Sequence, residues 1–230
     1  MDNSAYGWPF PEQTDPTPLM RRNIFFLIAP SLVLLAACHK EHCDTTPAPA
    51  GPSTTVQDYA KLAIGNYWVY QRLHVDTLGV EVDTGVLDSA AVVGDTLVNG
   101  YSFYVIQGTH GLANNNSYRT VQRDSAGYLV GLDGTRSFSL SGLAEVLAEH
   151  PVEPALGVMT STMVPGTSSH TVPAGTFTCI AIRTEAVTSV APIRTAYTFR
   201  GEGVGLVESE VFYLASGIRF RSKLLRYHVQ

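Results

Sequence analysis

Short runs of β-branched and aromatic residues, separated by tight turns, fill the sequence from residue 67 onward. These runs predict strands at residues 67–75, 86–93, 101–106, 118–123, 128–132, 136–140, 176–184, 194–200 and 206–214, followed by a C-terminal strand. Asn99-Gly100 predicts a type I′ hairpin turn, and only residues 143–150, which end before Pro151, are typical of a helix. We therefore expect an all-β fold with little helix, either an antiparallel sandwich or an open, twisted β-barrel.

The C-terminal strand changes the phase of its alternation partway along. Its first apolar set is Ile218, Phe220 and Leu224, and its second is Leu225, Tyr227 and Val229. Successive side chains of a strand point to opposite faces, so this shift by one residue would turn the second set outward. We predict a β-bulge at Leu224-Leu225 that keeps one apolar face directed inward.

An apolar segment that ends in a cysteine decides which residues belong to the fold. Residues 24–37 are apolar apart from Ser31, follow Arg21-Arg22, and end just before Cys38. These 14 residues are too few to span a bilayer but fit the apolar part of a signal peptide. Leu35-Ala36-Ala37-Cys38 resembles a bacterial lipobox, which predicts a signal peptide at residues 20–37 and acylation, including palmitate, of Cys38. The alternative is a short buried helix with a cysteine in the core.

The expected anchor divides the chain into segments. Met20 directly precedes the two arginines, so we expect residues 1–19 to be a disordered or non-native extension. Residues 38–58 contain three prolines among small and polar residues, which predicts a flexible tether. Residues 59–230 are long enough to form a single β-rich domain.

Charge and the start of the tether bear on location and partners. The net charge of −5 argues against a nucleic-acid partner, which usually requires a basic face. Lys40-Glu41 resembles the charged export tag of surface lipoproteins in the Bacteroidota. We therefore expect a cell-envelope protein, held at the outer membrane by its lipid, on either the periplasmic or the surface side.

The cysteines allow two further interpretations. Cys43 and Cys179 would form a disulfide in an oxidising compartment; alternatively, Cys179 is a small core residue. The tether also places Cys38, His39, His42 and Cys43 close together, which are residue types that bind zinc. Their spacing matches no closed four-ligand site, and Cys38 is expected to carry lipid, so we expect no metal site there.

Sequence motifs for catalysis are missing. The chain has no Gly-x-Ser-x-Gly elbow, no His-Glu-x-x-His and no phosphate-binding loop, and residues 201–205 fit a turn before a strand. The scattered histidines are His74, His110, His150, His170 and His228. The aromatic residues that fit either a ligand pocket or the core are Tyr67, Trp68, Tyr70, Tyr101, Phe103 and Tyr104. We expect no catalytic residue, cofactor or metal, with a hydrolase built on a non-contiguous site as the alternative.

Aspartate is followed by serine or threonine unusually often. The hydroxyl residues in those pairs that continue with a residue other than glycine are Thr45, Thr77, Ser89, Thr96 and Ser125. This pattern resembles the acceptor used for protein O-glycosylation in the Bacteroidota. Turn formation is the alternative, since Asp, Ser and Thr all favour turns.

Three segments together resemble a family. They are residues 65–70 (GNYWVY), 172–179 (VPAGTFTC) and 203–208 (GVGLVE), and in this order they are similar to secreted lipoproteins of the Bacteroidota whose activity is not known. The resemblance implies no catalytic residue. We expect a membrane-anchored extracytoplasmic lipoprotein that acts as a non-catalytic binding or envelope-structural module, with a glycan, lipid or protein as its ligand.

Intact-mass analysis of the native protein tests these modifications. We expect a chain that begins at Cys38 and carries both lipid and sugar. A mass that includes lipid but no sugar would contradict glycosylation, and an unprocessed N-terminus would contradict the lipobox.

Overall fold

The structure is a computed structural model that describes residues 54–110, 116–140, 144–152, 156–214 and 216–230. In chain order the elements are α1 (Val56–Ala60), β1 (Tyr67–Val75), β2 (Glu81–Val98), β3 (Tyr101–His110), β4 (Asn116–Ser125), β5 (Tyr128–Gly131), β6 (Arg136–Ser139), β7 (Val146–Val152), β8 (Gly157–Met163), β9 (Ser168–Val172), β10 (Gly175–Thr188), β11 (Arg194–Gly201), β12 (Gly205–Phe212) and β13 (Arg219–His228).

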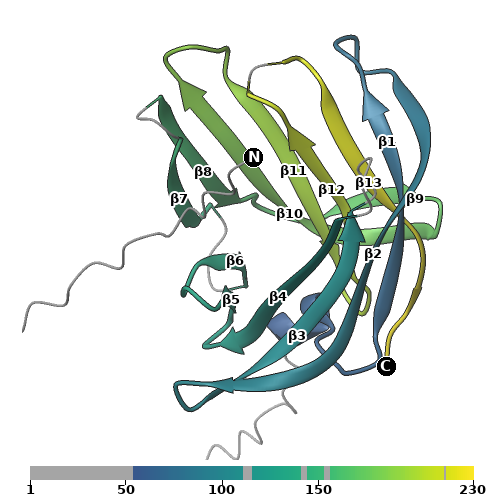
Figure 1. The fold of residues 1–230 in the computed structure, drawn as a ribbon, viewed down its shortest axis with the longest axis vertical. Helices are drawn as coiled ribbons and strands as arrows, with labels where there is room; N and C mark the ends of the chain where they lie inside the picture. The colour runs from purple at the N-terminus through teal and green to yellow at the C-terminus, as the bar shows by residue number, and fades with distance from the viewer. Residues whose placement is uncertain (1–53, 111–115, 141–143, 153–155, 215) are drawn as a thin grey trace, which may run out of the picture. The chain divides into compact units, whose positions relative to one another are not determined.

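One antiparallel sheet contains all of these strands. Its order is β6-β5-β4-β3-β2-β1-β13-β12-β11-β10-β8-β7, with β9 paired to β10 outside this path. Most neighbours in the sheet are also neighbours in sequence, and β1 pairs with β13 to join the two ends of the domain. The sheet curls into a nearly closed, barrel-like form (Figure 1). The predicted all-β antiparallel fold is confirmed. Of the two predicted forms, the open, twisted barrel matches the observed sheet.

The first predicted hairpin elements are confirmed in detail. Strand β1 covers the predicted residues 67–75. At the β2–β3 turn, Asn99 and Gly100 have φ angles of 51° and 80°, so both central residues take the positive φ that a type I′ turn requires. Strand β2 is much longer than predicted, because it continues on both sides of residues 86–93.

The predicted bulge in the C-terminal strand is also present. Val69 of β1 pairs with Arg226, whereas the next residue, Tyr70, pairs with Leu224. The ladder therefore skips Leu225, and Leu224 is fully buried. Leu225 and Tyr227 are each 37% exposed, which corrects their assignment to the inward apolar set. Leu225 is the extra residue of the bulge and is left unpaired.

The predicted helix at residues 143–150 is wrong. Residues Val146–Val152 form β7, which pairs with β8. Pro151 fits this strand because β7 ends the sheet, and an edge strand tolerates a missing backbone N–H. Strand pairing has overridden local helix propensity here. Within the described ranges, no helix has the length and apolar character needed to cross a membrane.

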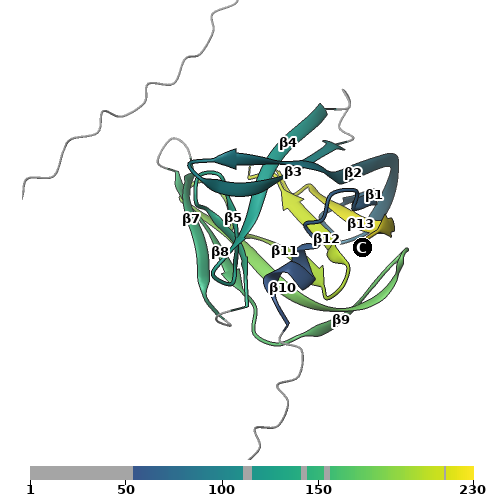
Figure 2. The same cartoon turned by 90° about the horizontal axis from the view of Figure 1, so that it is seen from below.

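The short helix α1 packs into the interior of the sheet, as the view from below shows (Figure 2). It begins at Val56, three residues ahead of the expected domain start, and Val56 is 1% exposed. The backbone N–H and hydroxyl of Thr55 donate to the Asp58 carboxylate at 2.7 and 2.9 Å. These bonds lower the pKa of Asp58 and fix the first turn of the helix.

Two apolar clusters fill the domain. The first is Val56, Tyr59, Ala60, Leu62, Leu129, Phe138, Leu147, Met163, Ile180 and Ile182. The second is Trp68, Tyr70, Val92, Val172, Cys179, Val204, Val207 and Leu224. Helix α1 thus packs against strands from both ends of the sheet, whereas the second cluster joins the β9–β10 hairpin to the strands around β1.

The β2–β3 pair allows a test of the sheet register. A Cβ atom at Gly108 would lie 1.9 Å from the carbonyl oxygen of Ser89 and 2.8 Å from the Tyr118 ring. Gly108→Ala should therefore lower the free energy of unfolding by about 3 kcal/mol, measured by urea denaturation. Gly94 is the matched control on β2, because a Cβ there meets nothing within 4 Å. Gly94→Ala should change stability by less than about 1 kcal/mol, and equal effects of the two variants would contradict the register.

Candidate functional site

A cavity of about 230 Å³ lies inside the sheet beside α1. Its walls come from the helix and the residues that follow it, from β1 to β4, and from β11 and β12. The lining residues are Ala60, Leu62, Trp68, Tyr70, Ala90, Ile106, His110, Tyr118, Thr120, Gln122, Arg200 and Leu206. Leu62, Trp68 and Tyr70 are buried, whereas His110 and Thr120 are exposed. The cavity therefore has a buried floor and a mouth at β3 and β4.

Hydrogen bonds to the backbone fix the aromatic floor. The indole N–H of Trp68 donates to the carbonyl of Val204 at 2.7 Å, and the Tyr70 hydroxyl donates to the carbonyl of Leu206 at 3.2 Å. Gly205 lies against the Trp68 ring with a φ of 96°, and a Cβ there would come within 3.3 Å of the ring. Gly205 therefore lets the backbone of the 203–208 segment approach Trp68 closely.

The mouth of the cavity carries a second pair of rings. His110 stacks on Tyr118 with ring centroids 4.3 Å apart. The Tyr118 hydroxyl donates to the carbonyl of Ser89 at 3.2 Å. Burial raises the pKa of both Tyr70 and Tyr118, so these phenols stay neutral and present their rings to the cavity.

Arg200 is the charged residue of the lining. Its Nη1 donates to the carbonyl of Tyr59 at the end of α1, at 3.3 Å, and its Cζ lies 5.8 Å from the centroid of the Phe138 ring. Its Nε is buried and has no hydrogen-bond partner among the described residues. Burial lowers the pKa of Arg200, although a guanidinium remains protonated at any physiological pH.

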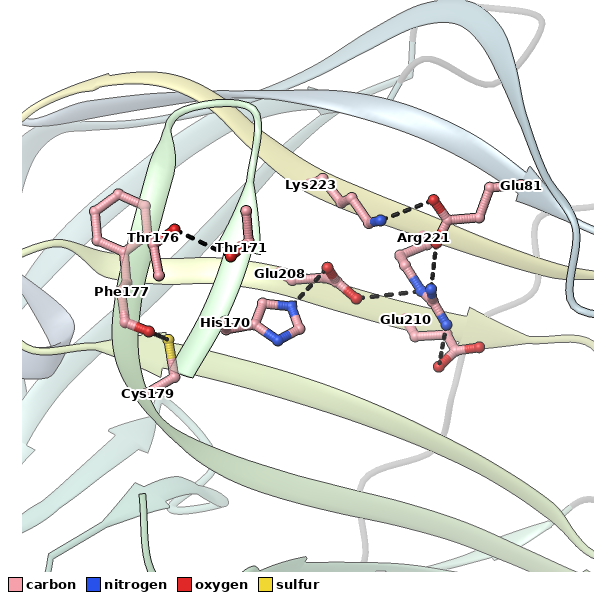
Figure 3. A network of polar contacts seen from close by, with 10 residues as sticks. All are labelled: Glu81, His170, Thr171, Thr176, Phe177, Cys179, Glu208, Glu210, Arg221 and Lys223. Carbon is pink, nitrogen blue, oxygen red and sulfur yellow. Dashed lines mark hydrogen bonds and ion pairs between the residues drawn. The ribbon is translucent and has the colours of Figure 1, made fainter. Parts of the chain in front are cut away.

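A second polar cluster lies where β9 faces β12 and β13 (Figure 3). Nε2 of His170 lies 2.8 Å from Glu208, whose other oxygen lies 3.2 Å from Nε of Arg221. Glu81 reaches across from β2 to Arg221 and to Lys223, the latter at 2.7 Å. We call these residues, with Arg219 and Glu210, the charge network.

The charge network balances its own charges. Glu208 and Glu210 are buried, and each contacts at least one arginine of β13. Register explains the contacts, because Glu208 pairs with Lys223 and Glu210 with Arg221 across the β12–β13 ladder. Opposite charges placed directly across two strands stabilise a sheet, so the network fits a structural role.

Cys179 does not extend this cluster into a reactive site. It is a fully buried free thiol, and burial raises its pKa to about 11. A thiol with so high a pKa is a poor nucleophile at neutral pH. Cys179 therefore matches the core-residue alternative; its proposed partner Cys43 lies outside the described residues, as do Cys38, His39 and His42.

The predicted histidines and aromatic residues are dispersed. His110 lines the cavity and His170 belongs to the charge network. The ring of His74 contacts Phe220, and the ring of His228 contacts Tyr67. No group of three metal-ligating side chains occurs among the described residues. Of the aromatic set, Trp68 and Tyr70 line the cavity, Tyr104 packs on both clusters, and Tyr101 and Phe103 pack against Arg123 elsewhere.

The candidate glycosylation residues differ in accessibility. Thr77 is exposed in the β1–β2 hairpin loop, next to Leu78. Ser89 lies mid-strand, and its hydroxyl hydrogen-bonds Thr109 at 2.9 Å. Thr96 and Ser125 are half-buried in strands, and Thr45 lies outside the described residues.

Comparison with known proteins assigns no family to this chain. No family model matches the chain, and no curated protein matches it significantly. A candidate exported protein with a YmcC-like fold from Bacteroides fragilis is 14% identical with a TM-score of 0.47, over 72% of this chain and 96% of that one. A candidate lipoprotein from Parabacteroides distasonis is 14% identical with a TM-score of 0.46, over 74% and 98%. Similarity this low carries no argument about the location or activity of this chain.

The charge network predicts a loss of stability in acid. Burial by itself would raise the pKa of Glu81, but Lys223 and Arg221 outweigh it and lower the pKa below 4.5. A carboxylate whose pKa is lower in the folded than in the unfolded chain stabilises the fold above pH 4.5, and this contribution disappears as pH falls through the folded-state pKa.

Urea midpoints measured from pH 7 to pH 3 should therefore fall more steeply for the parent chain than for Glu81→Gln, which should already be less stable at pH 7. Asp95→Asn, at an exposed carboxylate on the same strand, is the control. Parallel pH curves for the parent and Glu81→Gln would show that Glu81 is not coupled to the fold.

Proposed function

We propose that this chain is a lipid-anchored, extracytoplasmic binding module that takes up a small, largely apolar ligand in the cavity beside α1. The anchor rests on the sequence, in which the lipobox places the lipid on Cys38 and a proline-containing tether follows. The outer membrane is the proposed location. The similarity to a candidate lipoprotein is too low to add to this argument.

The cavity is the observation that supports binding. Small-molecule sites are concave and mostly apolar, with a few polar groups that orient the ligand. This cavity has that composition, since aliphatic and aromatic side chains form its floor and Arg200 is its charged group. Its volume of about 230 Å³ is below the roughly 300–1,000 Å³ typical of ligand sites, so the ligand is small.

The state of the polar groups favours binding over catalysis. The hydroxyls of Tyr70 and Tyr118 already donate to backbone carbonyls, and the raised pKa of each phenol keeps it protonated, so neither can accept a proton as a general base at neutral pH. The lining holds no carboxylate or thiol among the described residues. A reaction in this cavity would have to rely on His110 and Thr120 at its exposed mouth.

Sugar on the domain would leave the cavity accessible. Thr77 is the described candidate that combines exposure with a loop position, and it is absent from the cavity lining. We propose that Thr77 is the modified residue among the described candidates, because a transferase needs an accessible hydroxyl.

Trp68 provides a direct readout of binding. The chain has two tryptophans, so a full-length Trp8→Phe chain leaves Trp68, in the cavity floor, as the remaining reporter. Titration with hexanol and with hexanoate should change its fluorescence saturably. Ala90 lines the cavity, and Ala90→Leu should weaken this binding at least tenfold because the larger side chain occupies the ligand's space.

Ala148→Leu is the control, since Ala148 is half-buried on β7 and does not line the cavity. This variant should bind like the parent chain. No saturable change with either probe, or unchanged binding by Ala90→Leu, would contradict the proposed function.

A further inference from the structure

We infer that the ligand of this cavity is a small monocarboxylate with an apolar body, and that its carboxylate contacts Arg200. This inference rests on the proposed binding function and specifies the chemistry of the ligand. The observation behind it is a half-buried arginine at the wall of an apolar cavity, whose buried Nε has no partner and whose guanidinium forms no ion pair among the described residues.

The hydrogen bonds of Arg200 fall short of what burial requires. A guanidinium carries five N–H donors, and moving a charge out of water is costly unless it is paired. Arg200 gives one donor to Tyr59, and its Nε has no partner among the described residues. None of the ion pairs found among those residues includes Arg200.

Arg72 shows how the same domain pairs an arginine with a carboxylate, although its Nε, like that of Arg200, has no hydrogen-bond partner among the described residues. Arg72 is 6% exposed and its guanidinium lies 3.1 Å from Asp88, whereas Arg200 is half-buried. Ser222 donates a further hydrogen bond to the same carboxylate. An acidic residue therefore accompanies the charge of Arg72, whereas the open side of Arg200 is the cavity. A bound anion would supply the missing partner.

Volume and lining define the rest of the ligand. A cavity of about 230 Å³ holds a ligand smaller than those of typical pockets, which have roughly 300–1,000 Å³. Leu62, Ile106 and Leu206 offer aliphatic contact, and the Trp68 ring offers a flat face. The lining has a single permanently charged group, which suits a monoanion; a phosphate dianion would call for more than one cation. A carboxylate matches the planar guanidinium in a two-point contact.

Three probes with the same six-carbon chain and different head groups distinguish the effect of charge on affinity from that of apolar contact. They are hexanoate, hexanol and hexylamine. In the full-length Trp8→Phe chain, hexanoate should bind at least tenfold more tightly than hexanol, and hexylamine should bind most weakly. Arg200→Met keeps a similar length without the charge, so it should bind hexanoate and hexanol with equal affinity.

Arg194→Met is the matched control, because Arg194 is half-buried on the same strand, also has an unpartnered Nε, and lies outside the cavity. It should keep the preference for hexanoate. Arg200 also contacts the end of α1, so thermal unfolding must confirm that Arg200→Met folds. Arg200→Lys retains the charge and should keep the preference, which allows a test even if the methionine variant fails to fold.

The possible failures are distinguishable. Equal binding of hexanoate and hexanol by the parent chain, or a preference that survives in Arg200→Met, would overturn the carboxylate inference and leave the binding function standing. Binding of none of the three probes would overturn the proposed function as well.

Discussion

The packing of helix α1 inside the sheet is the interaction on which the interior of this protein depends. Val56, Tyr59 and Ala60 enter a core that joins strands from both ends of the sheet. The same five-residue helix accepts a hydrogen bond from Arg200 and, through Asp58, one from the backbone of Gly203. Helix α1 therefore closes one side of the interior and fixes the wall of the cavity where Arg200 lies.

Buried charge is handled in different ways across the domain. Arg72 pairs with Asp88, and the glutamates of β12 pair with arginines of β13. In both arrangements, the oppositely charged side chains come from neighbouring strands of the sheet. Arg200 differs because it faces the cavity and the helix instead of a carboxylate. This contrast between arginines with and without an ion pair leads from the fold to a ligand.

Local features of the sequence predicted local features of the fold. The β-branched and aromatic residues of β1 and the Asn99-Gly100 pair specify strand and turn by backbone preference alone. The phase shift at Leu224 predicted the bulge because alternation in a strand admits few exceptions. The helix prediction around Val146 was wrong because pairing with β8 stabilises a strand more than local propensity stabilises a helix there. No local pattern in the sequence reveals that pairing.

The cavity could be predicted only in part. Trp68 and Tyr70 stood out as aromatic residues that fit either pocket or core. Arg200 did not stand out, because an arginine in an alternating strand looks the same whether its face is solvent or interior. Its placement depends on the curl of the whole sheet and on α1, which lies 141 residues away in sequence at Tyr59. The sequence therefore identifies the aromatic residues of the cavity as candidates but does not identify Arg200.

A crystal structure of the protein with 6-bromohexanoate tests the account most directly. We expect an anomalous bromine peak inside the cavity and a carboxylate about 3 Å from the Arg200 guanidinium. A cavity filled by side chains, with Arg200 paired to a carboxylate of the protein and bromine bound only elsewhere, would contradict it.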